Sequence, residues 1–199
     1  MRTGKFASSD TQYLENRKTL SEKYGPRELW SVIDHWPLYA GTANLARYIS
    51  NYELLKSVQD VPGHIAEFGS WRGANLMFLA KLQEILDPGS SKMIHCFDSF
   101  EGLQTFNEAD GSATVFRGEY KGSLEELQDF INLYELSDTI KFHIGDVRNT
   151  VSEALKNDQS LQFSFVYLDV DLYEPTLVAL QECHTRLSLG GLFILDEWG

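Results

Sequence analysis

The stretch Ala66-Glu67-Phe68-Gly69-Ser70-Trp71-Arg72-Gly73 decides the expected fold of this 199-residue chain. It ends an apolar run and leads directly into an amphipathic segment at 74–86, so it predicts a strand, a tight glycine turn and a helix. Its acid precedes the first glycine, in the spacing E-x-G-x-x-x-G, which differs from the G-x-G-x-x-G of dinucleotide-binding turns. We therefore expect a βα unit that binds a ligand other than a dinucleotide.

Short apolar runs alternate with amphipathic segments from this stretch to the end of the chain. Such spacing implies right-handed crossovers, so we predict an α/β fold: a Rossmann-like, doubly wound, mainly parallel sheet of five strands. Ligands of such sheets bind beyond the carboxyl ends of the strands. Strands are expected at 65–68, 93–97, 140–144, 163–168 and 192–195, and helices at 74–86, 124–136, 151–156 and 175–187.

Capping signals set the expected ends of these helices. Ser123 with Glu126 and Thr150 with Glu153 fit the capping box, and Gly190-Gly191 is typical of a helix stop. Residues 1–62 are expected to form a helical extension that covers the cofactor or substrate, and residues 63–199 the ligand-binding core.

Composition narrows the function classes. The net charge of −12 leaves no basic face for phosphates, so we expect no nucleic-acid partner. No apolar run reaches the length of a membrane span and no leader-like segment follows Met1, so we expect a cytoplasmic protein. Cys96 and Cys183 lie in apolar runs without metal-ligand spacing and are expected to be buried free thiols.

The glycine turn carries the first candidate site. Glu67 before the first glycine would repel a pyrophosphate but can hold an ammonium group, which favours an amino-acid-bearing cofactor such as S-adenosylmethionine. Gly69, Ser70 and Gly73 then permit close approach of the backbone to that cofactor at a helix N-terminus. The alternative is that the two glycines merely form a turn.

The next two strand ends also carry acids. Asp98 is placed to accept hydrogen bonds from the ribose hydroxyls of an adenosine cofactor, with Ser99 beside it. Asp146, after the third strand, could accept the adenine amino group. A solvated strand-end acid is the alternative for Asp98, and an ordinary Gly-Asp turn the alternative for Asp146.

Carboxylates follow the last two strands as well. If these strands are neighbours, Asp169, Asp196 and Glu197 converge, and an all-oxygen cluster suits Mg²⁺. Alternatively, Asp171 caps the following helix and Glu197 is simply exposed. Among the histidines, His95 and His143 are expected in the core, while His35 and His64 could approach the cleft and receive no role.

These motifs together resemble the macrocin O-methyltransferase family of class I S-adenosylmethionine-dependent methyltransferases. The resemblance is carried by the segments 38–44, 66–73, 97–103 and 169–176. It implies Mg²⁺-assisted methyl transfer to a hydroxyl of a deoxysugar, a sugar nucleotide or a polysaccharide unit. It would place Glu67, Gly69 and Ser70 on the methionine end, Asp98 on the ribose and Asp146 on the adenine, with Asp169, Asp196 and Glu197 as metal ligands.

Within this resemblance Asp169 is the candidate general base. Sugar-modifying members carry two consecutive Asp residues where this chain has Asp196-Glu197, which weakens the expectation of strict metal dependence. In the family the fold continues past the fifth strand with a helix and two strands, so the core is expected to be C-terminally truncated. An exposed edge of the fifth strand would then favour pairing with a second copy.

Two other functions stay open from sequence. One is a cofactor-binding protein without turnover, suggested by the early end of the chain. The other is an NAD-dependent nucleotide-sugar oxidoreductase, which would need the dinucleotide spacing that this turn does not have.

Overall fold

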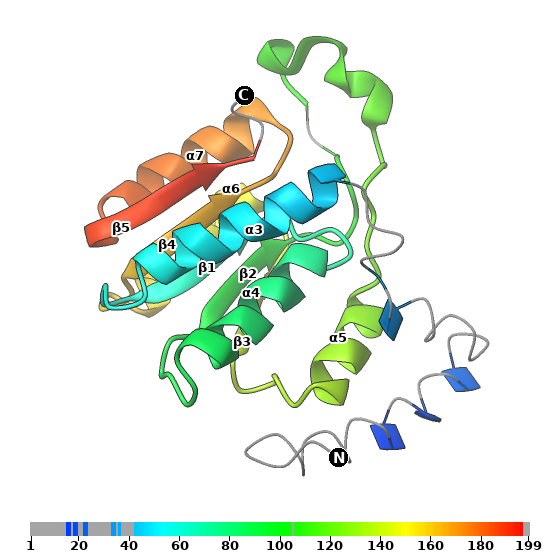
Figure 1. Ribbon diagram of the computed structural model, residues 1–199. Coiled ribbons are helices and arrows are strands. Elements are labelled where there is room, and N and C mark those ends of the chain that lie inside the picture. Colours follow the sequence, from blue (N-terminus) through cyan, green and yellow to red (C-terminus); the bar gives the residue numbers. More distant parts are fainter. Residues whose placement is uncertain are drawn as a thin grey trace.

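The computed structural model describes residues 15–16, 18–19, 22–23, 33–34, 36, 42–104 and 106–196. Within them, five parallel strands form one sheet in the order β3-β2-β1-β4-β5 (Figure 1). This is the predicted doubly wound α/β class. The elements are α3 (Thr42–Ser57), β1 (His64–Phe68), α4 (Ala74–Leu86), β2 (Ile94–Asp98), η2 (Glu108–Phe116), α5 (Leu124–Leu133), β3 (Ile140–Ile144), α6 (Val147–Asn157), β4 (Phe163–Leu168), α7 (Tyr173–His184) and β5 (Leu187–Leu195).

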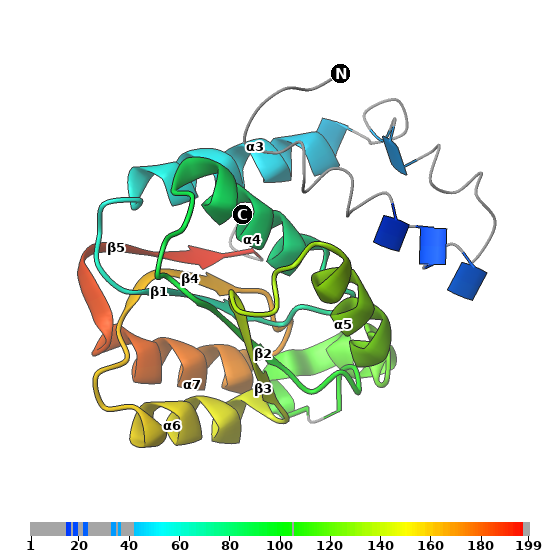
Figure 2. The same cartoon turned by 90° about the horizontal axis from the view of Figure 1, so that it is seen from below.

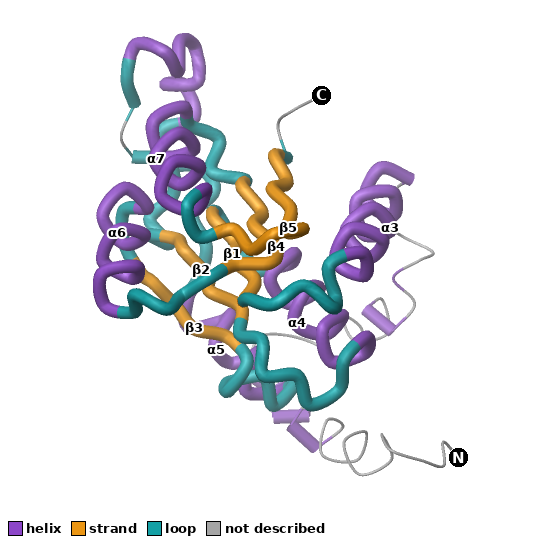
Figure 3. The backbone as a smooth tube through the Cα atoms, turned by 90° about the vertical axis from the view of Figure 1, so that its left-hand side faces the viewer, coloured by secondary structure: helices purple, strands orange, loops and turns teal. Residues whose placement is uncertain are grey.

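Helices cover both faces of the sheet. Helices α3, α4 and α5 lie on one face and α6 and α7 on the other, as Figures 2 and 3 show from two directions. Because strand side chains alternate between faces, each face has its own apolar core. The first core includes Leu55, Leu76, Leu127, Ile94 and Tyr167. The second includes Phe68, Phe97, Val151, Val166 and Cys183.

The strand registers bring the carboxyl ends of the strands to one edge. Phe68, the last residue of β1, lies opposite Phe97 on one side and Leu168 on the other. Leu168 in turn lies opposite Leu195 of β5. The segment 106–122, which contains η2, projects beyond this edge in Figure 1. Its Asp110 Oδ1 accepts a hydrogen bond of 2.8 Å from the backbone N–H of Tyr173 at the start of α7.

Several predicted boundaries are confirmed, including those of α4, β3 and β4. Ser123 caps α5 by accepting a hydrogen bond of 3.2 Å from the Glu126 N–H. The expected cap at Thr150 is wrong. Helix α6 begins one turn earlier, because the side chain of Asp146 accepts from the Arg148 N–H and so caps it.

The interpretation of Gly190-Gly191 as a helix stop is also wrong. Helix α7 has already ended at His184, and both glycines lie inside β5. The register shifts in this region, and a Cβ at Gly191 would lie 3.0 Å from the Ser164 carbonyl oxygen of β4. The glycines therefore permit an irregular, close pairing of β5 with β4.

Helix α3 packs directly on the core, although the sequence places it in the extension. Its Leu55 is 3% exposed and Val58, directly after the helix, is 1% exposed, and both belong to the first apolar core. The predicted boundary between residues 62 and 63 stays a prediction, since most of residues 1–41 lie outside the described part. Among the helices described, none is long and apolar enough to cross a membrane. Cys96 and Cys183 are both buried and free, as predicted.

Candidate active site

A cavity of about 670 Å³ opens at the carboxyl edge of the sheet. It is formed by the turns that follow all five strands and by one side chain of α3, Arg47. The candidate residues that line it are Glu67, Gly69, Ser70, Asp98, Ser99, Asp146, Asp169 and Asp196. The structure thus brings most of the candidates together, at the edge where a ligand of an α/β sheet is expected. Gly73 lies outside the lining, and Glu197 lies outside the described residues.

The turn after β1 packs closely against the end of β4. Gly69 has a φ of +81°, and a Cβ at this position would lie 1.9 Å from the Asp169 carbonyl oxygen. The Gly69 N–H donates to the Phe97 carbonyl and the Asp169 N–H to the Phe68 carbonyl, both at 2.9 Å. Only glycine fits here, because any side chain would collide with the backbone of Asp169. Gly73, with a φ of +78°, instead caps α4 against the side chain of Leu127.

Glu67 is a buried acid with one unused oxygen. Its side chain is 1% exposed. Its Oε1 accepts a hydrogen bond of 3.2 Å from Asn75 Nδ2, and Asn75 Oδ1 accepts one of 2.7 Å from Asn51 Nδ2 of α3. Its Oε2 accepts none from the residues that the structure describes. Burial raises the pKa of Glu67 to about 8. A buried carboxyl oxygen without a partner, in a residue that lines a cavity, fits a ligand that brings its own donor and positive charge.

Asp98 joins two turns. Its Oδ2 accepts hydrogen bonds from the backbone N–H groups of Ser70 at 2.6 Å and Trp71 at 2.9 Å. Its Oδ1 accepts one from the Phe100 N–H at 2.6 Å. The neighbouring Ser99 Oγ accepts from the Glu101 N–H at 3.2 Å. Asp98 therefore fixes the turns after β1 and β2 relative to each other, whether or not it also meets a ribose.

Asp146 is engaged on both oxygens. Besides capping α6, it accepts from Arg148 Nε at 2.9 Å on Oδ1 and 3.1 Å on Oδ2. These hydrogen bonds from Arg148 lower the pKa of Asp146. Arg148 also donates to Glu174 Oε2 of α7 at 2.8 Å. The cap and the ion pair explain the acid without a ligand, so contact of this carboxylate with adenine stays a prediction.

The carboxylates after β4 and β5 meet a cation from the chain itself. Asp196 Oδ2 accepts a hydrogen bond of 2.8 Å from Arg47 Nη2, and Asp196 Oδ1 accepts one from the hydroxyl of Tyr167. Asp169 lines the same cavity. Two neighbouring carboxylates are a donor set that Mg²⁺ accepts. In the described part of the chain, however, no group of three His, Cys, Asp or Glu residues is placed to hold a metal ion.

Four polar residues of this site were missed by the sequence analysis: Asn51, Asn75, Arg47 and Tyr167. Tyr167 could have been found, because it precedes Asp169 by two residues in a strand and so shares its face. Burial and the hydrogen bond to Asp196 raise the pKa of this phenol. Helix α3 contributes two of the four, and no sequence signal connects it to the sheet edge.

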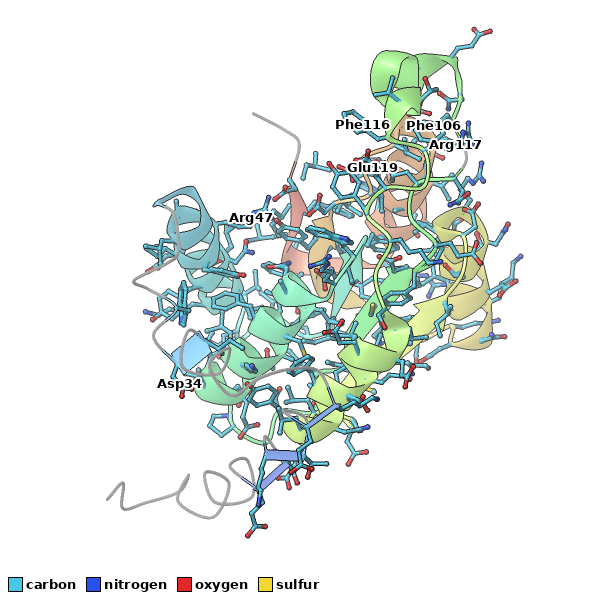
Figure 4. All side chains as sticks on the ribbon, turned by 90° about the vertical axis from the view of Figure 1, so that its right-hand side faces the viewer. Asp34, Arg47, Phe106, Phe116, Arg117 and Glu119 are labelled. Atoms are coloured by element: carbon cyan, nitrogen blue, oxygen red, sulfur yellow. The ribbon has the colours of Figure 1, made fainter. Side chains whose placement is uncertain are left out.

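Aromatic side chains stand at the rim of the cavity. Trp71 and Tyr120 pack edge to face with ring centroids 5.6 Å apart, and they are 46% and 42% exposed. Both line the cavity. Figure 4 shows the nearby residues Phe106, Phe116 and Arg117 on the projecting segment beyond the strand ends. The rim therefore offers apolar ring faces next to an acidic interior.

The histidines within the described residues do not line this cavity. His95 is 3% exposed, which confirms it as a core residue, whereas His143, whose Nε2 lies 2.9 Å from His95 Nδ1, is only half-buried. Burial lowers the pKa of His95 to about 3 and that of His143 to about 4. His64 is the first residue of β1, at the opposite end of the strand, and its Nδ1 accepts from the Met93 N–H. His35 lies outside the described residues.

Comparison with known proteins identifies relatives. The profile of the macrocin O-methyltransferase family (TylF) matches residues 8–199. A 4'-O-methyltransferase of 8-demethyl-8-(2,3-dimethoxy-alpha-L-rhamnosyl)-tetracenomycin-C from Streptomyces olivaceus is 30% identical over 175 residues, 82% of this chain. Demethyldecarbamoylnovobiocin O-methyltransferase from Streptomyces niveus is 26% identical over 180 residues, also 82% of this chain. The matched regions span 64% of the length of each of these two relatives.

Solved structures show the same fold. The crystal structure of the calicheamicin methyltransferase CalS11 superposes with a TM-score of 0.78 and 26% identity, covering 98% of this chain and 80% of that protein. The O-methyltransferase NovP superposes with a TM-score of 0.66 and 24% identity, covering 75% of this chain and 64% of that protein. The similarity therefore extends over the sheet edge that carries the cavity.

Proposed function

The chain belongs to the macrocin O-methyltransferase family, and from that premise we propose that it methylates a sugar hydroxyl with S-adenosylmethionine as the methyl donor. The observation that carries the cofactor assignment is Glu67. Glu67 lines the cavity, its buried Oε2 lacks a partner among the described residues, and burial raises the pKa of its carboxyl group to about 8. An ammonium group would supply both the missing hydrogen bond and the charge that keeps this carboxylate ionised.

The residues around Glu67 would hold the cofactor. Gly69 lets the turn lie close to the end of β4, and the backbone N–H groups at the start of α4 would face the carboxylate of the cofactor. Asp98 holds the turn in place through Ser70 and Trp71. Asn75 fixes the orientation of the Glu67 carboxyl group. S-adenosylmethionine, when bound, supplies an already activated methyl group, so the protein must mainly align the acceptor oxygen with it.

Asp169 is the proposed general base. It lies at the end of β4, beside Gly69 and in the lining of the cavity, where it can accept the proton of an acceptor hydroxyl. Mg²⁺, if bound, would be held by Asp169 and Asp196, with Glu197 next in the chain, and would orient the acceptor and lower the pKa of its hydroxyl.

The proposed acceptor is a deoxysugar carried by a natural product or a nucleotide. The Streptomyces olivaceus relative is named for a rhamnosyl compound. The rim of this cavity supports such an acceptor, because sugar rings and aromatic aglycones both pack on exposed aromatic faces like those of Trp71 and Tyr120.

Calorimetric titration with S-adenosylhomocysteine tests the cofactor assignment. We expect saturable binding to the wild-type protein and binding at least about 10-fold weaker to Glu67→Gln, which keeps the size of the side chain but not its charge. Fluorescence titration with NADH serves as the control and should show no binding. A folded sample that binds NADH but not S-adenosylhomocysteine would contradict the proposal. A methyl-transfer assay over glycosides and sugar nucleotides then identifies the acceptor class.

A further inference from the structure

Arg47 reaches from α3 across the carboxyl edge of the sheet to Asp196. Its Nη2 lies 2.8 Å from Asp196 Oδ2, although the two residues are 149 positions apart. Figure 4 shows Arg47 pointing from α3 toward the strand ends. The Asp196 side chain is 15% exposed and that of Arg47 is 51% exposed. The ion pair therefore lies at the mouth of the cavity, with its acid inside and its base partly in water.

The position of Arg47 is set by the way α3 packs. Asn51, one turn later on the same face of α3, is 3% exposed and donates to Asn75 of α4. Leu55, a further turn on, lies in the apolar core. Partial burial opposes the charge on Arg47, but Asp196, Tyr167, Asp169 and Tyr48 together outweigh it and raise the pKa of the guanidinium. Helix α3 thus holds a permanent positive charge beside the two carboxylates.

We propose that Arg47 is the resident counter-ion of Asp196 and that it competes with a divalent cation for this carboxylate. The inference rests on the proposed function, because it concerns the carboxylates assigned there to Mg²⁺. Asp196 accepts from the Tyr167 hydroxyl on Oδ1 and from Arg47 on Oδ2, so Oδ2 is the oxygen at which the guanidinium and a metal ion would compete. Mg²⁺ binds carboxylate oxygens at about 2.0–2.1 Å, and a guanidinium 2.8 Å from the same oxygen repels it.

This competition predicts how the affinity for a metal ion changes when Arg47 is removed. A cation that enters must displace Arg47, so the free energy of the ion pair opposes its binding. Removing the guanidinium should therefore tighten binding of the metal ion, by about 3- to 10-fold for a pair that is partly exposed to water. If Arg47 instead helped to build the metal site, its removal would weaken binding. The two roles therefore predict opposite changes in metal affinity when Arg47 is replaced.

The experiment measures binding of Mn²⁺ to the full chain without cofactor, by the loss of the electron paramagnetic resonance signal of free Mn²⁺. We expect Arg47→Met to bind Mn²⁺ about 3- to 10-fold more tightly than wild type, and Arg47→Lys, which keeps the charge, to stay near wild type. Arg72→Met is the matched control. Arg72 lies over the Trp71 ring in the neighbouring turn, so its removal deletes one charge without touching Asp196.

A second measurement needs no variant. Hydrogen exchange of wild-type peptides covering 42–50 should speed up when Mn²⁺ is added, because the first turns of α3 lose their tie to β5. Equal affinity of wild type and Arg47→Met, weaker binding by that variant, or an equal gain in Arg72→Met would overturn the inference. Absence of Mn²⁺ binding by every sample would overturn it too, while titration of the same samples with S-adenosylhomocysteine reports separately on the proposed function.

Discussion

The backbone of Gly69 lies so close to that of Asp169 that a Cβ on the glycine would be 1.9 Å from the Asp169 carbonyl oxygen. Two parts of the site 100 residues apart in sequence are thereby joined. One is the turn proposed to hold the cofactor, and the other is the strand end that presents the proposed base. The contact fixes the position of this turn relative to that strand end.

The first prediction concerns this contact. Gly69→Ala combines a strained positive φ with a backbone clash, so it should lower the free energy of unfolding by more than about 2 kcal/mol and abolish detectable binding of S-adenosylhomocysteine. Urea unfolding and calorimetry measure the two effects. Gly89→Ala is the control. Gly89 likewise has a positive φ, of +78°, but nothing lies within 4 Å of its Cβ position. Similar losses in both variants would mean that strain alone matters.

The second prediction follows from the pKa of Glu67, which burial raises to about 8. The folded, cofactor-free protein keeps this proton between about pH 4.5 and 8, whereas the unfolded chain loses it. This contribution to stability is therefore present at low pH and is lost as the pH rises toward 8. The free energy of unfolding of wild type relative to Glu67→Gln should decline over this range. A constant difference between the two proteins would argue against a buried, protonated Glu67.

The third prediction concerns His95 and His143, whose pKa values burial lowers to about 3 and about 4. The unfolded chain takes up protons below about pH 6.5 while these folded imidazoles stay neutral. Their contribution to stability is thus present above pH 6.5 and is lost as the pH falls toward 4. His143→Phe keeps a ring stacked on Phe97. In this variant the free energy of unfolding should fall less than in wild type as the pH is lowered from 6.5 toward 4. Nitrogen NMR signals of both rings that titrate near pH 6.5 would refute the prediction.

The fourth prediction tests the proposed base. Asp169→Asn keeps the shape of the side chain but cannot accept a proton, so kcat/KM for methyl transfer should fall about 100-fold or more. Binding of S-adenosylhomocysteine should change little, because Glu67 and the glycine turn are intact. Glu84→Gln, an exposed change on α4, is the charge-matched control. A loss of less than about 5-fold in Asp169→Asn would point to another base.

The fifth prediction tests the aromatic rim. Tyr120→Ala should raise the KM for the acceptor about 10-fold with little change in kcat, because the ring provides uniform binding at the cavity mouth. Tyr120→Phe keeps the ring and should remain close to wild type. Steady-state kinetics with saturating S-adenosylmethionine separate the two parameters. An unchanged KM in Tyr120→Ala would remove this residue from the acceptor site.

The sequence by itself determined the fold class and the location of the site. Alternating apolar and amphipathic segments are a local property, and they identified a parallel sheet whose carboxyl ends carry Glu67, Asp98, Asp146, Asp169 and Asp196. The predicted ends of helices and strands were wrong where one residue pattern fits two kinds of structure. Gly190-Gly191 resembled a helix stop, but the close approach of β4 and β5 makes the glycines part of a strand.

Tertiary structure alone decided which acids keep an unused oxygen and which are already paired. Glu67 loses solvent because two apolar cores close around β1, and that burial raises its pKa. Asp146 is paired with Arg148, which also pairs with Glu174, and Asp196 is bonded to Arg47 and Tyr167. Arg47 could not be found from sequence, because its distance from Asp196 depends on how α3 packs across the sheet. Residue type sets what a side chain can do, and packing sets which partner it meets.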